Sequence, residues 1–177
     1  MGYIPPGQSA GMKKVRLDEV ENAIQPAAVL RKLTKPLGTT DLAINYYELE
    51  PGDSFGFAYH SHEIQEEVFY IQEGTVTFET EDGQVAVGPG EFIRFGPGEF
   101  QRGWNRDDER VVALALGAPL EYGTIVKLRQ CDSCGERTDS RLEREEEAGD
   151  SAIVAYCKEC DAETGRWYRG SMEGTVP

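Results

Sequence analysis

The sequence lacks any long hydrophobic run. No apolar stretch in its 177 residues approaches the roughly 20 residues that a membrane-spanning helix needs. Its first residues also lack the basic and then apolar pattern of a secretory signal peptide. We therefore expect a soluble, cytoplasmic protein with no membrane partner, long enough for one well-packed core and a small appendage.

Positive charge is also scarce. The chain has 18 Lys and Arg residues against 32 Asp and Glu residues, which gives a formal net charge of −14. Such a surface repels the phosphate backbones of DNA and RNA. We therefore expect no nucleic-acid partner.

Histidine is the scarcest of the metal-binding residue types. The chain has two, His60 and His62, and they lie two positions apart. In a β-strand, residues i and i+2 point to the same face and lie roughly 7 Å apart. Both imidazoles can then reach one ion above that face. The pair therefore predicts a β-strand that carries two metal ligands.

A carboxylate ligand is expected after this pair, and Glu66 and Glu67 are the candidates. In an extended strand Glu67 shares the more apolar face with Phe69 and Ile71, so Glu67 points inward. On one continuous strand, however, Glu67 and His62 would lie on opposite faces. The segment between them must therefore turn a corner between two strands.

The stretch around these residues resembles the first motif of the cupin superfamily, which has the form glycine, spacer, His-x-His, three or four residues, glutamate, six residues, glycine. Gly52, His60, His62, Glu67 and Gly74 follow this order, with a slightly longer spacer after Gly52 than usual. The resemblance covers about residues 27–120. It implies a double-stranded β-helix barrel in which the two histidines and the glutamate hold a divalent metal ion.

The second cupin motif has the form glycine, spacer, Pro-x-Gly, two residues, histidine, three residues, asparagine. It is similar to the stretch from Gly88 to Asn105. The approximate matches are Gly90, Pro97, Gly98 and Asn105. Gln101 replaces the histidine of the motif, so the fourth metal ligand is left open, with the Gln101 amide oxygen as its candidate.

Short β-rich segments punctuated by glycine and proline run through the middle of the chain. They comprise residues 42–49, 75–80, 84–87, 91–95 and 110–116. Short strands at this spacing, without helical patterns between them, indicate an all-β jelly-roll barrel or sandwich. We expect a lead-in over residues 1–26, the barrel over 27–120 and a small module over 121–177.

All four cysteines lie in the last of these segments, as the pairs Cys131-x2-Cys134 and Cys157-x2-Cys160. Each pair suits one edge of a tetrahedral Zn²⁺ site with Zn–S bonds of ~2.3 Å, and the module resembles a zinc ribbon. In a cytosolic chain this spacing favours a structural zinc over two disulfides, four free thiols or a redox pair. Trp167 is expected to pack under this ribbon; the alternative is an exposed apolar patch on residues 161–177, around Trp167 and Tyr168, that binds a partner protein.

Two imidazoles and one carboxylate leave two or three positions of an octahedral ion for water or substrate. Such an ion can polarise a bidentate oxygen ligand or bring O₂ beside it. The donor set does not distinguish Fe, Mn, Ni and Zn. No general base is evident, and Glu66, Tyr46, Tyr47 and Tyr59 are candidates by proximity alone.

Two functions follow from these patterns. The first is a metal-binding cupin that binds or transforms a small molecule, with oxidoreductase or isomerase chemistry. The second is a non-catalytic metal or ligand sensor that uses the zinc ribbon to bind a partner. A barrel that binds no metal is the alternative to both. The resemblance also implies a homodimer that forms through sheet edges.

Overall fold

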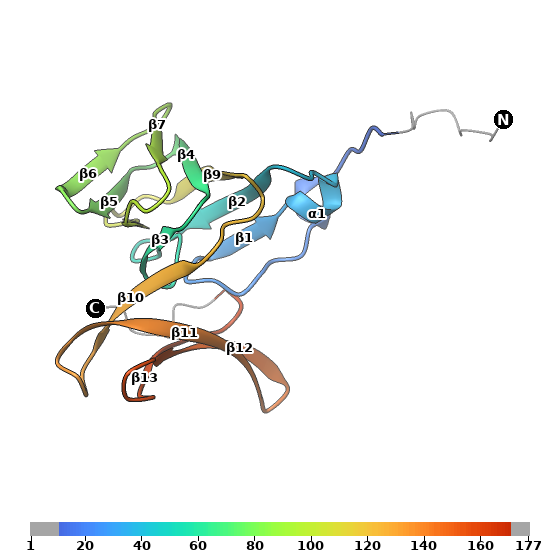
Figure 1. Ribbon diagram of the computed structural model, residues 1–177. Helices are drawn as coiled ribbons and strands as arrows, with labels where there is room; N and C mark the ends of the chain where they lie inside the picture. The colour runs from blue at the N-terminus through green and yellow to red at the C-terminus, as the bar shows by residue number, and fades with distance from the viewer. Residues whose placement is uncertain (1–10, 171–177) are drawn as a thin grey trace.

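The structure, a computed structural model, describes residues 11–170, with Glu147 described by its backbone alone. These residues form thirteen β-strands and two short helices (Figure 1). The elements in chain order are the 3₁₀-helix Leu17–Glu19, β1 (Val29–Lys32), α1 (Thr34–Leu37), β2 (Ala43–Leu49), β3 (Tyr59–His62), β4 (Glu66–Glu73), β5 (Val76–Thr80), β6 (Gly83–Val87), β7 (Phe92–Phe95), β8 (Gln101–Trp104), β9 (Val111–Ala118), β10 (Ile125–Cys131), β11 (Glu136–Glu147), β12 (Asp150–Cys157) and β13 (Glu163–Trp167). No helix within residues 11–170 combines the length and the apolar character that a membrane span requires.

The strands form two antiparallel sheets. One sheet has the order β1-β2-β9-β4-β7, and the other has the order β13-β12-β11-β10-β3-β8-β5-β6. The expected all-β class with a double-stranded β-helix barrel is confirmed. The C-terminal strands β10 to β13 continue the second sheet beyond the barrel.

Aromatic side chains form part of the core between the two sheets of the barrel. The ring of Phe69 on β4 lies with its centroid 4.8 Å from that of Phe55 and 5.1 Å from that of Phe78 on β5. Burying each phenylalanine stabilises the fold by roughly 1.5–3 kcal/mol. A Cβ atom at Gly103 would lie 2.7 Å from both Phe55 and Phe78. Glycine at this position therefore lets β8 lie against the rings.

The chain passes from one sheet to the other directly after the histidines. β3 ends at His62 in the eight-stranded sheet, and β4 begins at Glu66 in the five-stranded sheet. The corner expected between His62 and Glu67 is thereby confirmed. Gln65 in this corner is 5% exposed, and its side-chain amide donates a hydrogen bond to the carbonyl of Pro119 at 2.6 Å. That bond ties the corner to the segment after β9.

The C-terminal segment is joined to the barrel through strand pairing. β10 pairs with β3, and this register sets Lys127 opposite His60 and Ile125 opposite His62. Figure 1 shows β10 leading from the barrel into the curved layer of β11, β12 and β13. The acidic segment at residues 142–150 forms the paired end of the β11–β12 hairpin.

Trp167 packs between this layer and the barrel. Its side chain is fully buried, and its ring centroid lies 4.9 Å from that of Phe57. The guanidinium of Arg129 lies 4.7 Å from the Trp167 ring centroid and donates a hydrogen bond to the Phe57 carbonyl. The expected packing of Trp167 is confirmed. The alternative of an exposed patch is wrong for Trp167, and residues 171–177 of that patch lie outside the described residues.

Replacing Trp167 tests this contact. Trp167→Ala removes the ring that joins β13 to the Phe57 segment and is expected to lower the free energy of unfolding by about 3–5 kcal/mol. Chemical denaturation measures the change. Val85→Ala, at a position that is 45% exposed, is the control and is expected to cost below about 1 kcal/mol. Equal effects of the two substitutions would contradict the packing.

Candidate metal centre

His60 and His62 lie on one face of β3, as the strand period predicts. Their ring centroids are 5.1 Å apart and their planes meet at 81°. Both side chains line the same cavity between the sheets. The side chain of His60 is 16% exposed and that of His62 is 12% exposed. Both imidazoles are therefore largely shielded from bulk water.

Glu67 approaches this pair from β4 in the opposite sheet. Its Oε2 atom lies 3.7 Å from His60 Nε2 and 3.4 Å from His62 Nε2. One ligand atom from each of the three residues falls within 4.8 Å of the others. Ligand bonds of ~2.1 Å separate neighbouring ligand atoms by about 3.0 Å in octahedral and about 3.4 Å in tetrahedral geometry. The three donors are thus close to the spacing that a shared cation needs.

The hydrogen bonds of the histidines leave nitrogen atoms available for a cation. His60 Nδ1 lies 3.0 Å from the carbonyl of Ala58, so Nδ1–H donates to this oxygen and Nε2 keeps its lone pair. The His62 Nδ1 and Nε2 atoms are buried and have no hydrogen-bond partner. A buried polar atom without a partner is costly. A bound cation would satisfy one of these nitrogens.

The Glu67 carboxyl is ionised. Burial raises its pKa, but the adjacent imidazoles of His60 and His62 outweigh that effect and lower the pKa to about 2. Glu67 therefore presents a carboxylate, which is the form that binds cations.

Gln101 on β8 lies beside the same three residues, directly opposite His60 in the β3–β8 pairing. Its Nε2 atom donates to Glu67 Oε2 at 2.9 Å and lies 3.4 Å from His60 Nε2. Its Oε1 atom is buried without a partner. The amide holds the Glu67 carboxylate in this arrangement, and a half-turn of the amide would present Oε1 to the same centre.

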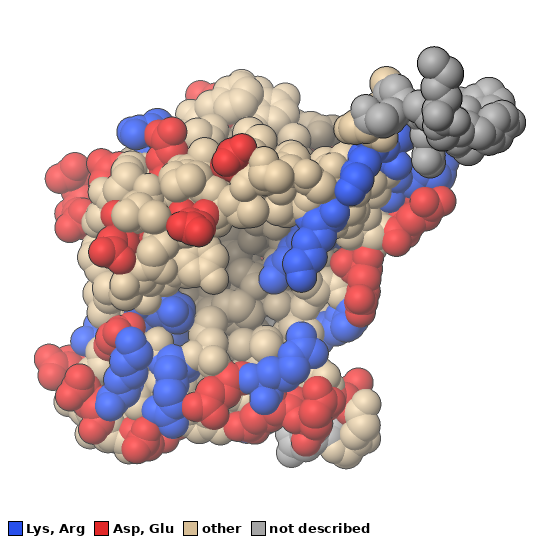
Figure 2. Space-filling view, turned by 45° about the vertical axis from the view of Figure 1, so that its right-hand side comes forward, with Lys and Arg blue, Asp and Glu red and all other residues tan. Residues whose placement is uncertain are grey.

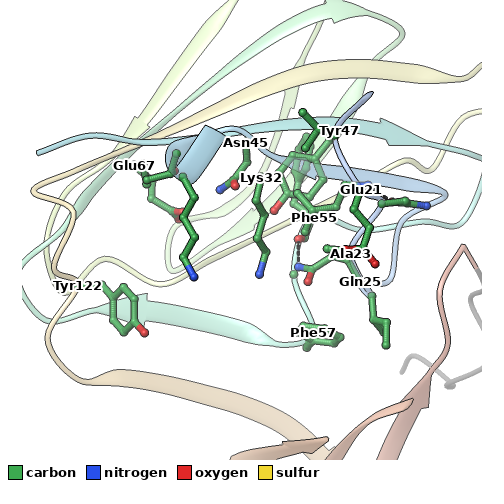
Figure 3. Close-up of a pocket in the computed structure, with 18 of the residues that line it drawn as sticks. Glu21, Ala23, Gln25, Lys32, Asn45, Tyr47, Phe55, Phe57, Glu67 and Tyr122 are labelled. Carbon is green, nitrogen blue, oxygen red and sulfur yellow. Dashed lines mark hydrogen bonds between the residues drawn. The ribbon is translucent and has the colours of Figure 1, made fainter. Parts of the chain in front are cut away.

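A cavity of about 1430 Å³ opens beside these residues. Tyr47, Phe55 and Phe57 are among the side chains of its wall (Figure 3). Its volume exceeds the 300–1,000 Å³ range, roughly, of small-molecule sites. The arrangement therefore combines candidate metal ligands with space for a small organic molecule.

The chain matches the model of the family described as Cupin domain over residues 45–117. Residues 45–117 are a cupin domain. This confirms the family that the two motifs predicted. A comparison with curated proteins found no match.

Solved structures share the cupin fold. A sugar phosphate isomerase from a cupin superfamily of Silicibacter pomeroyi is 19% identical with a TM-score of 0.54, and the alignment covers 88% of this chain and 92% of that chain. The polyketide cyclase RemF of Streptomyces resistomycificus is 25% identical with a TM-score of 0.55, with coverage of 68% and 88%. A predicted oxalate decarboxylase of Thermotoga maritima is 22% identical with a TM-score of 0.52, with coverage of 60% and 99%.

Four side chains near the histidines, Glu66, Tyr46, Tyr47 and Tyr59, are candidates for a general base, and their positions relative to the cavity distinguish them. Tyr47 lines it, and burial raises the pKa of its phenol, with the charge of Glu67 adding to the shift. Glu66 instead forms an exposed ion pair with Arg94 at 2.6 Å. Tyr46 and Tyr59 do not line the cavity. Among these four candidates, Tyr47 is therefore the one placed to meet a ligand.

The basic residues of the cavity wall carry no motif in the sequence. Lys32 on β1 and Lys127 on β10 both line the cavity. Partial burial lowers the pKa of Lys127, while Asp139 acts in the opposite direction. No local pattern marks Lys127, because the β3–β10 pairing that brings it to His60 joins distant parts of the chain.

The four cysteines form a second cluster beyond the cupin domain, and none is in a disulfide. Their sulfur atoms all lie within 4.8 Å of one another. Cys131 Sγ lies 3.5 Å from Cys160 Sγ, and Cys134 Sγ lies 3.9 Å from Cys157 Sγ. Four Zn–S bonds of ~2.3 Å at tetrahedral angles separate the sulfurs by about 3.8 Å. The cluster is consistent with the expected zinc-ribbon-like module.

One thiol of this cluster is prepared for metal binding by its neighbours. The Thr138 hydroxyl lies 3.0 Å from Cys157 Sγ. This hydrogen bond, together with backbone hydrogen bonds from Cys160 and Glu159, lowers the pKa of the Cys157 thiol to about 6, against burial, which raises it. Gly135 follows the first pair with φ of 75°, a conformation that glycine adopts without strain and that the knuckle turn requires.

Cys131→Ser tests the cysteine cluster. The substitution removes one of four thiolates, so the chain is expected to release one equivalent of zinc and to loosen in β10 to β13 while the cupin domain keeps its structure. Elemental analysis and amide hydrogen exchange measure the two effects. Zinc content equal to that of the unaltered chain would contradict the assignment.

Proposed function

We propose that this protein is a metal-dependent cupin that binds and transforms a small molecule in the barrel cavity. His60, His62 and Glu67 hold a divalent ion. The observation that carries the proposal is the convergence of these three side chains from two sheets, together with the unpartnered nitrogens of His62. An ion at this place would border the cavity and reach whatever occupies it.

The bound ion would supply Lewis-acid polarisation of an oxygen ligand or a place for O₂. The remaining steps belong to residues of the chain. Gln101 holds the Glu67 carboxylate through its amide. The Ala58 carbonyl fixes the His60 tautomer. Tyr47 keeps its proton, so its hydroxyl can donate a hydrogen bond to a ligand oxygen.

The reaction class we propose is that of an oxidoreductase or an isomerase. The similar solved cupins are described as a sugar phosphate isomerase, a polyketide cyclase and a predicted oxalate decarboxylase. They support the choice of a small molecule as ligand. We propose that the ion is Fe, Mn, Ni or Zn, because each of these metals accepts two imidazoles and a carboxylate as ligands.

The role proposed for the cysteine module is structural, with one zinc on Cys131, Cys134, Cys157 and Cys160. A closed four-thiolate site leaves no open position for a substrate. A sensor that binds a partner protein through an apolar patch at Trp167 is disfavoured, because Trp167 is fully buried. We retain the homodimer and the cytoplasmic location as predictions.

Metal analysis of two variants tests the proposed function. The purified chain is expected to contain metal beyond one zinc, and His60→Ala and His62→Ala should each lose this extra metal while the zinc remains. Elemental analysis measures both. Cys131→Ser is the matched control, expected to lose the zinc alone. The proposal fails if both histidine variants keep the metal content of the unaltered chain.

Gln101 provides a separate test of the centre. Gln101→Leu removes the amide that holds Glu67 and is expected to weaken barrel-metal affinity by roughly tenfold to a hundredfold. Gln101→His adds an imidazole and should raise affinity for Zn²⁺ and Cu²⁺. Competition with a chromophoric chelator measures both. Unchanged affinities in both variants would show that Gln101 does not face the ion.

A further inference from the structure

The barrel cavity has a charge opposite to that of the whole protein. The chain carries a net charge of −14, yet six basic and three acidic side chains line the cavity. Four of these basic residues are lysines, and they are found at positions 14, 32, 35 and 127. The chain has six lysines in all. Figure 2 shows basic side chains reaching over the hollow on this face from both of its sides.

Lys127 is held next to the candidate metal centre by strand register. It lies opposite His60 in the β3–β10 pairing, and facing residues of such a pair have Cβ atoms about 4.5–5.5 Å apart. Its ammonium donates to the Ile125 carbonyl at 3.3 Å. The nearby Asp139 carboxylate instead accepts from the Lys127 backbone N–H and pairs with Lys158.

Lys32 enters the cavity from the other sheet. It lies at the end of β1, opposite Asn45 on β2, and both residues line the cavity. Figure 3 shows its side chain extending into the space between the sheets, on the same side as Glu67. Lys32 and Lys127 therefore approach the cavity from opposite sheets.

Neither lysine has an acidic partner in the described part of the chain. The salt bridges there occupy other cations, such as Lys158 with Asp139 and Arg94 with Glu66. The absence of such ion pairs at the two lysines, among the described residues, is notable because the chain has 32 acidic residues. Lys127 is half-buried and Lys32 is exposed, and because neither ammonium is held in an ion pair there, both are available for a charge-assisted hydrogen bond to an anion that enters the cavity.

We propose that the cavity ligand is an anion, a small molecule with a carboxylate or phosphate group that Lys32 and Lys127 bind from opposite walls. This inference rests on the proposed function in that it takes the cavity as the ligand site. Lys127 belongs to β10, so the C-terminal strands complete the ligand site as well as holding the cysteine cluster. The placement beside His60 orients the anionic group toward the centre formed by His60, His62 and Glu67.

Calorimetric titration with matched probes tests the anion site. Succinate and inorganic phosphate are titrated into the full chain, together with succinamide, which has the shape of succinate without its charge. At least one anion is expected to bind and succinamide is not. Tighter binding of succinate would identify a carboxylate ligand, and tighter binding of phosphate a phosphate ligand. Equal binding of succinate and succinamide, or no binding of either anion, would overturn the proposal.

Charge-removing variants locate the site. Lys32→Met and Lys127→Met are each expected to weaken anion binding roughly tenfold or more, as loss of a hydrogen bond to a charged group does. Arg106→Met is the control, because Arg106 is exposed, lies outside the cavity wall and carries the same charge. An equal loss in Arg106→Met would overturn the assignment. The comparison of succinate with succinamide needs no variant and stands even if a lysine variant fails to fold.

The same titrations separate this inference from the proposed metal site. Lysine-dependent anion binding by a chain that holds no barrel metal would remove the metal proposal and keep the anion site. Barrel metal in a chain that binds neither anion would remove the anion site and keep the metal proposal. Metal content measured in Lys127→Met is expected to equal that of the unaltered chain.

Discussion

The structure depends on the meeting of Glu67 with His60 and His62 across a corner between two sheets. The two imidazoles come from β3 and the carboxylate from β4, so their proximity exists only while the sheets keep their relative position. Gln65 secures the corner by donating to the Pro119 carbonyl. A Cβ at Gly117 would come within 2.8 Å of the Gln65 side chain, so glycine on β9 leaves the space that Gln65 fills. The aromatic core then fixes the distance between the sheets.

The C-terminal strands are part of this arrangement. β10 pairs with the strand that carries both histidines, and Arg129 on β10 donates to the Phe57 carbonyl just before that strand. The strands that hold the cysteine cluster therefore support β3, which carries both histidines and lies between β10 and β8 in the sheet. We propose residues 27–120 and 121–177 as the barrel and the module, after a lead-in of residues 1–26, although hydrogen bonds cross the boundary between them. A small module stabilised by metal would thus serve the ligand site of a larger barrel.

The alternation of side chains along β-strands, with a period of two residues, predicted much of the fold and of the candidate metal centre. The shared face of His60 and His62, the inward side of Glu67 and the intervening corner all follow from the alternation of a few residues along one segment. Cysteine spacing is local as well, and it predicted the four-sulfur cluster. Lys127 could not be predicted, because its position beside His60 depends on a register between distant strands. The assignment of Gln101 relied on resemblance, and its orientation toward Glu67 depends on the pairing of β8 with β3.

Anomalous X-ray diffraction from crystals of the protein tests the central claim most directly. Data collected on both sides of the absorption edge of the metal found by elemental analysis locate each ion without reference to activity. One peak is expected at ~2.0–2.2 Å from His60 Nε2, a nitrogen of His62 and a carboxylate oxygen of Glu67, and a separate zinc peak is expected among the four cysteines. Anomalous signal at the cysteines alone, from crystals grown with added divalent metal, would contradict the central claim.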